Sequence, residues 1–176
     1  IKKSILKSKN KKFIFSYWPN YDSLCHEYGV NSNKVEKHFL KWDKEFKKFI
    51  NRIKNTNTCV LITADHGFID TAKDKIVKLK NHPELKKCLT LPFSGEARSV
   101  YCYVNPNKTK EFEKYVTSKL NKVCNLIKSE EAIEKGYFGL FEPNPKLINR
   151  IGNYILILKE NYIFIDKLLG QKYKSH

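Results

Sequence analysis

Two pairs of acidic and imidazole side chains are the residues of this sequence best suited to chemistry. Asp65 and His66 are adjacent, and Asp22 and His26 are four residues apart. A carboxylate oxygen and an imidazole nitrogen are ligands that Zn²⁺ accepts, and Mn²⁺ is compatible with the same set. Either pair alone is weak evidence, because an Asp-His-Gly tripeptide is common and an Asp and a His on one helix can lack any shared role. Together they predict two divalent metal ions in one cleft, which could clamp the attacking and leaving oxygens of a phosphoryl group.

The elements expected around these pairs would bring each pair next to the end of a strand. Residues 59–63 form a short apolar, β-branched run that predicts a buried central strand. The adjacent pair would then lie at the carboxyl end of this strand, where open α/β sheets bind ligands. Residues 13–17 predict a second strand, and a short helix after it ends near Gly29 and carries the other pair on one face.

The rest of the chain alternates between helical and strand patterns. A long helix from Ser32 or Asn33 to about Lys54 has apolar residues at steps of three and four, which predicts one face packed on a sheet. A strand at 162–165 is expected to pair with a strand at 154–158. The other expected elements are strands at 99–104 and 124–127, and helices at 81–89, from Pro106 onward and at 130–135. This order favours a layered α/β domain.

The composition describes a strongly basic chain with enough apolar residues for a core. It has 176 residues, 41% of them hydrophobic, which fits one domain or a large part of a larger one. The net charge of +16 favours a phosphorylated substrate. The lysines are spread over the whole chain without an arginine-rich stripe, which argues against nucleic acid as the partner. No apolar run approaches the roughly 20 residues of a membrane span.

Cysteine usage and the start of the sequence suggest a compartment. The five cysteines are scattered and form no C-x-x-C pair, which is typical of reduced thiols in a cytoplasmic protein. No secretory signal opens the sequence. Because the sequence contains no Met and begins at Ile1, we expect either a segment of a longer chain or a chain whose initiator was removed.

Three further side chains could take part in a site. Arg98, beside Glu96, could bind a phosphate through its planar guanidinium group or form an ion pair within its loop. His38 lies among lysines and is expected to be solvated, whereas His82 precedes a proline at a helix start and is expected to be structural. No G-x-S-x-G motif occurs, so the sequence gives no support to a Ser-His-Asp mechanism.

Four motifs follow one another between residues 17 and 153. They are Tyr17-x-Pro19-x-x-Asp22-x-x-x-His26-x-x-Gly29-x-x-Ser32, Thr63-Ala64-Asp65-His66-Gly67, Gly95-Glu96-Ala97-Arg98 and Arg150-Ile151-Gly152-Asn153. In this order they resemble the type I phosphodiesterase/nucleotide pyrophosphatase family of the alkaline phosphatase superfamily. The first two are the specific ones. The third has Ala97 where the family has Pro, and the fourth has Asn153 where the family has Asp.

The resemblance implies an α/β fold with a mostly parallel central sheet flanked by helices. It implies that Asp22 and His26 bind one metal ion and that Asp65 and His66 bind the other, with Zn²⁺ favoured over Mn²⁺. In the family a further His near the C-terminus completes the first site, and His176 is the candidate here. The nucleophile of the family, a Thr or Ser, would lie upstream of these motifs. Residues 1–176 are therefore expected to be an incomplete catalytic domain that lacks its nucleophile-bearing part.

The sequence leaves three hypotheses for function. The first is a fragment of a metal-dependent phosphoester hydrolase that acts on a nucleotide or another phosphorylated small molecule, and that is a poor enzyme by itself. The second is a truncated, inactive homologue that serves as a binding or structural domain. The third, motivated only by the charge of +16, is a nucleic-acid-binding domain.

Overall fold

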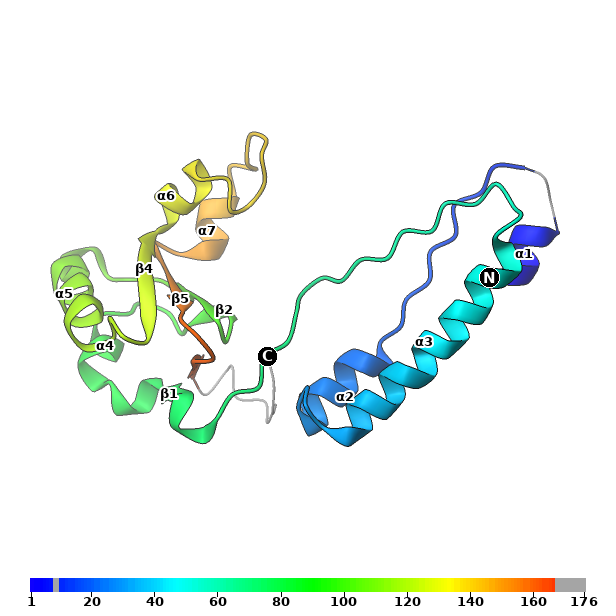
Figure 1. Ribbon diagram of the computed structural model, residues 1–176. Coiled ribbons are helices and arrows are strands. Elements are labelled where there is room, and N and C mark those ends of the chain that lie inside the picture. The colour runs from blue at the N-terminus through cyan, green and yellow to red at the C-terminus, as the bar shows by residue number, and fades with distance from the viewer. Residues whose placement is uncertain (8–9, 167–176) are drawn as a thin grey trace. The chain divides into compact units, whose positions relative to one another are not determined.

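The computed structural model describes residues 1–7 and 10–166 (Figure 1). The chain divides into two compact units, and the division falls between Asp70 and Thr71. Among the described residues, the first unit contains three helices and no named strand, whereas the second contains every named strand. Both acid–imidazole pairs belong to the first unit, and Arg98 belongs to the second.

The first unit consists of helices α1 (Lys2–Leu6), α2 (Asn20–Tyr28) and α3 (Asn33–Ile53). Helix α2 begins after Pro19 and ends at Gly29, whose positive φ of 85° lets the chain leave the helix. Helix α3 is capped by Ser32, whose hydroxyl accepts the Val35 N–H at 3.4 Å. Both helices agree with the sequence prediction, and they lie side by side (Figure 1). In the described part of the chain, no helix is both long enough and apolar enough to cross a membrane.

The structure has no strand at 13–17 or at 59–63, so both of these predictions are wrong. Both segments lack named secondary structure, and Phe13 and Leu61 are 91% and 88% exposed. An apolar, β-branched run favours a pleated and buried setting, but a strand forms only where another strand supplies backbone hydrogen bonds. Among the described residues, neither segment pairs with a named strand.

The second unit is built on a four-stranded antiparallel sheet in the order β2-β3-β5-β4. The bounds are β2 (Ser94–Glu96), β3 (Ser99–Cys102), β4 (Cys124–Lys128) and β5 (Tyr154–Leu158). In the register, Val100 faces Leu156 on one side of β5 and Leu126 faces it on the other. A separate parallel pair joins β1 (Ile76–Lys78) to β6 (Ile163–Ile165).

The predicted α/β class is confirmed, and the structure refines the predicted sheet. Among the named strands of the described residues, only β1 and β6 pair in parallel, whereas the larger sheet is antiparallel. The prediction that 162–165 pairs with 154–158 is wrong. Strand β5 is hydrogen-bonded to β3 on one edge and to β4 on the other, so it has no free edge for β6.

Helices cover both faces of β5, which explains why this strand is apolar at every position. Tyr154, Leu156 and Leu158 belong to one buried cluster together with Phe112 of helix α5 (Thr109–Lys119). Ile155 belongs to a second cluster, with residues of α6 (Ser129–Glu134) and α7 (Leu147–Ile151). Successive side chains of a strand point to opposite faces, so a strand buried on both faces reads as a continuous apolar run. The remaining elements are α4 (Pro83–Lys87) and the 3₁₀ turns Lys73–Lys75, Leu79–Asn81 and Pro106–Lys108.

His82 lies at the start of α4 and gives the second unit a pH-dependent stability. Its Nδ1 is 2.9 Å from the Tyr115 hydroxyl oxygen, and burial lowers the pKa of His82 below 6.5. The unfolded chain therefore takes up this proton before the folded chain does. The free energy of unfolding should fall as the pH drops below about 6.5.

The His82→Gln variant should lose less stability than the wild type between about pH 7 and pH 5, since it removes the group that titrates. Urea unfolding of both proteins at several pH values gives, for each, the slope of the free energy of unfolding against pH. The slopes should coincide above about pH 8, where His82 is neutral in both states. Identical slopes below pH 6.5 would contradict the assignment.

Candidate metal centre

Three side chains from two parts of the first unit converge on one point. Helix α2 places Asp22 and His26 one turn apart, with His26 Nε2 3.4 Å from Asp22 Oδ1. His66 comes from the segment after α3, and its Nε2 lies 3.5 Å from the same Asp22 oxygen. One ligand atom from each of the three residues lies within 4.8 Å of the other two. We call Asp22, His26 and His66 the triad.

The two distances from Asp22 Oδ1 to the imidazole nitrogens suit a shared metal ion better than direct hydrogen bonds. N–H···O hydrogen bonds have donor–acceptor distances of about 2.7–3.2 Å, shorter than the 3.4 and 3.5 Å observed here. Two ligand atoms that each lie about 2.0 Å from a tetrahedral Zn²⁺ are about 3.3 Å apart. The donor set of one carboxylate and two imidazoles is also one that Zn²⁺ binds. The triad therefore fits a divalent ion.

The tautomer of His66 supports the same interpretation. Its Nδ1 lies 2.9 Å from the Gly67 carbonyl oxygen, which can only accept a proton. The proton is therefore on Nδ1, and the other ring nitrogen, Nε2, lies 3.5 Å from Asp22 Oδ1. Metal-binding histidines have this arrangement, with one nitrogen bound to a carbonyl and the other free for the metal. A cation between Nε2 and the carboxylate would stabilise these two atoms.

Asp65 lies outside the triad. Its side chain is 83% exposed, and its Oδ1 is 4.0 Å from His66 Nε2. The backbone bends at Asp65. The side chains at 66, 68 and 70, at every second position after the bend, contact α2 or the turn after it. The structure thus brings together three of the four residues of the predicted acid–imidazole pairs. His176, the fifth predicted ligand, lies outside the described residues.

Phe68 is a residue of the site that the sequence analysis missed. Its ring meets the His26 ring at 74° with centroids 5.1 Å apart, and the His66 ring at 69° with centroids 4.9 Å apart. It also contacts Tyr21 of α2 edge-on. A half-buried aromatic ring between two imidazoles limits their rotation. The signal in the sequence is its position two residues after His66, which places both side chains on the same side of an extended chain.

Arg98 is engaged by the backbone in the second unit. Its guanidinium group donates to the Tyr162 carbonyl at 3.0 Å and to the Glu160 carbonyl at 2.5 Å. It therefore ties the β2–β3 turn to the turn between β5 and β6. These contacts support a structural role for Arg98 rather than phosphate binding or an ion pair with Glu96.

The two remaining histidines have different environments from each other. His38 is half-buried and stacks on Trp18 at 5.1 Å between centroids, so the prediction that it is solvated is wrong. His82 bonds Tyr115 within the second unit, as expected of a structural residue.

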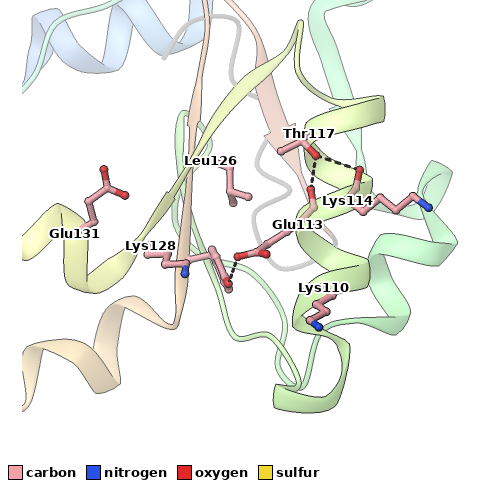
Figure 2. A pocket seen from close by; sticks show the side chains of 8 residues that line it. Lys110, Glu113, Lys114, Thr117, Leu126, Lys128 and Glu131 are labelled. Carbon is pink, nitrogen blue, oxygen red and sulfur yellow. Dashed lines mark hydrogen bonds between the residues drawn. The ribbon is translucent and has the colours of Figure 1, made fainter.

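The second unit also has a hollow of about 670 Å³ between α5, β4 and α6 (Figure 2). Tyr154 donates a hydrogen bond to Glu113 at 2.6 Å, and burial together with this carboxylate raises the pKa of Tyr154. The Thr117 hydroxyl donates to carbonyls of its own helix, at Glu113 and Lys114. Internal bonds thus account for the polar groups Glu113, Thr117 and Tyr154, and the hollow does not resemble a catalytic constellation.

A family comparison agrees with the motifs found in the sequence. The model of the type I phosphodiesterase/nucleotide pyrophosphatase family matches residues 2–176. The chain belongs to this family. The family that the four motifs indicate is therefore confirmed, and at this level the protein is a relative of phosphoester hydrolases. A search of curated proteins gives no match.

Solved structures of ectonucleotide pyrophosphatase/phosphodiesterase 5 have a similar fold. The human protein aligns with a TM-score of 0.64 at 17% identity, and the murine protein with 0.63 at 16%. An inactive murine variant in complex with AMP aligns with 0.62 at 16%. Each alignment covers 91% of this chain and 41% of the solved chain. At these identities the likeness shows the fold, and the chain spans about two fifths of the length of these relatives.

Proposed function

We propose that this chain is part of a metal-dependent phosphoester hydrolase that acts on nucleotide-type phosphodiesters or pyrophosphates. The convergence of Asp22, His26 and His66 carries the proposal. Family membership supports the reaction class. The murine relative in complex with AMP supports a nucleotide as substrate, and the net charge of +16 favours an anionic one.

The triad would hold one divalent ion, with Zn²⁺ favoured and Mn²⁺ compatible. We assign Asp65 to a second ion, because its Oδ1 is 4.0 Å from His66 Nε2 and its exposed side chain has room to turn. Bound ions in such a site lower the pKa of the attacking hydroxyl and stabilise charge on the phosphoryl oxygens. The attacking Thr or Ser of the family lies outside the motifs of this chain.

The residues of this chain would set the geometry of the site. Asp22 and His26 are fixed by one helix turn, and Phe68 limits the rotation of both imidazoles. His66 is the exposed member of the triad, so the ion would face solvent on its side. An open coordination position on that side is what a substrate oxygen requires.

The experiment uses the full-length protein that contains these residues. Bound metal and hydrolysis of bis(p-nitrophenyl) phosphate are measured before and after chelation, and again after addition of Zn²⁺ or Mn²⁺. The proposal expects activity that is lost with the metal and restored by it. Metal binding without hydrolysis would favour the inactive homologue. Absence of bound metal would overturn the proposal.

The Asp65→Asn variant tests the second ion. We expect two bound ions in the full-length wild type and one in this variant, because the amide is a poor substitute for the carboxylate ligand. The stoichiometry is measured by inductively coupled plasma mass spectrometry after equilibration with Zn²⁺. Two ions in both proteins would remove Asp65 from the ligand set and leave the triad as assigned.

A further inference from the structure

Asp70 connects the segment that carries His66 to the turn between α2 and α3. Its Oδ1 accepts the Val30 N–H at 2.7 Å, and its Oδ2 accepts the Asn31 backbone N–H at 3.3 Å and side-chain N–H at 3.0 Å. We propose that Asp70 is a positioning residue for the metal site, which holds His66 in register with Asp22 and His26. This inference rests on the proposed metal-binding function of the triad.

The turn after α2 is shaped to admit this carboxylate. Gly29 has φ of 85°, and a Cβ at this position would lie 3.0 Å from Asp70 Oδ1. A side chain at residue 29 would therefore push the carboxylate away from the N–H groups of the next two residues. Hydrogen bonds from backbone N–H groups to a carboxylate are charge-assisted and shorter than neutral ones. The glycine thus lets Asp70 make a specific contact with Val30, which lies 40 positions earlier in the chain.

The alternation of the chain transmits this contact to the metal site. His66, Phe68 and Asp70 lie at every second position and all contact α2 or its turn. The segment before them is exposed and belongs to no named strand, so no strand pairing among the described residues fixes its register. A shift by one residue would turn His66 away and bring a different side chain toward α2. The contact of Asp70 with the turn after α2 fixes the position of the segment at one point, and Phe68 supports it. His66 lies four residues before Asp70 and is held in place by both.

The free energy of metal binding depends on this preorganisation. An unanchored segment must lose conformational freedom when His66 binds the ion, which lowers the affinity. Residues that orient a ligand typically change metal affinity by about 10- to 100-fold when replaced. We therefore expect Asp70→Ala to weaken Zn²⁺ binding by roughly tenfold or more.

The test compares wild type, Asp70→Ala, Asp70→Asn and the control Asp43→Asn in the full-length protein. Asp43 is exposed on α3, so its variant makes the same change of charge away from the Asp70 contact. Zn²⁺ affinity is measured by competition with a chromophoric chelator, and the ligand geometry by the visible spectrum of bound Co²⁺. The Asp70→Asn amide oxygen can still accept the Val30 N–H, but its NH₂ group faces the Asn31 donors.

We expect a graded loss of affinity from wild type through Asp70→Asn to Asp70→Ala, a changed Co²⁺ spectrum, and no change in Asp43→Asn. Equal losses in both Asp70 variants would show that charge rather than hydrogen bonding matters, and would overturn the inference. A lower melting temperature with unchanged Zn²⁺ affinity and Co²⁺ spectrum would also overturn it, because the role would then be structural only. Failure of His26→Ala to weaken binding would instead refute the metal site itself.

Discussion

Replacement of His66 by alanine should lower the affinity of the site for Zn²⁺ by at least about 100-fold, since loss of a direct ligand exceeds the roughly 10- to 100-fold cost of losing a residue that only orients one. His66 is the member of the triad that comes from outside α2. Without it, the remaining pair of Asp22 and His26 offers two ligands from adjacent helix turns. Two ligands leave a Zn²⁺ site two short of the four-coordinate geometry it prefers, and water must supply the rest.

Zn²⁺ titration of the full-length protein in the presence of a competing chelator measures this loss. His38→Ala is the matched control, because His38 belongs to the same unit and stacks on Trp18 outside the triad. The control should bind Zn²⁺ like the wild type. If both variants lost affinity equally, the effect would come from destabilised packing, and the assignment of His66 as a ligand would be wrong.

Helical spacing is the part of the site that could be predicted from the sequence. A separation of four residues on a helix fixes the relative direction of Asp22 and His26, and their 3.4 Å approach follows from it. The sequence alone does not distinguish Asp65 from His66 as a ligand. For two adjacent residues, the directions of the side chains depend on the backbone conformation, which the spacing does not give. In the structure the chain bends at Asp65, and of the two residues only His66 lies within the triad.

Strand pairing is the part of the fold that local pattern could not decide. The segments 59–63 and 162–165 are both short apolar runs. The second pairs with β1, nearly 90 residues earlier, and the first has no named partner among the described residues. Apolar patterning measures the tendency to be buried in a sheet, whereas the partner depends on which edges remain free. Strand β5 has no free edge, which excludes β6 from pairing with it, and β6 pairs with β1 instead.

The motif at 150–153 could be related to a family from the sequence, but its physical purpose required the structure. The Asn153 N–H donates to the Cys102 carbonyl at 2.9 Å, and the Asn153 side chain accepts the Val104 N–H at 2.8 Å. Gly152 forms a bridge with Cys102 of β3. The motif thus joins the end of α7 to the end of β3, where the backbone must approach closely.

Gly152→Ala is expected to be the most destabilising of these substitutions, at about 3–5 kcal/mol in the free energy of unfolding. Gly152 has φ of 66°, which L side chains rarely adopt, and a Cβ would lie 2.7 Å from the carbonyl carbon of Cys102. Cys102 is fully buried, and β3 is held between β2 and β5. The clash is with backbone inside a sheet, so relief requires moving a paired strand rather than rotating a side chain.

Urea unfolding, followed by circular dichroism, compares this variant with wild type and with Gly67→Ala. A Cβ at Gly67 would meet no heavy atom within 4 Å other than those of its chain neighbours, so this variant adds the same methyl group in open space. We expect its free energy of unfolding to stay within about 0.5 kcal/mol of the wild type. A similarly small change in Gly152→Ala would mean that the α7–β3 junction can open without cost, and that the bridge between Gly152 and Cys102 does not hold the end of the sheet.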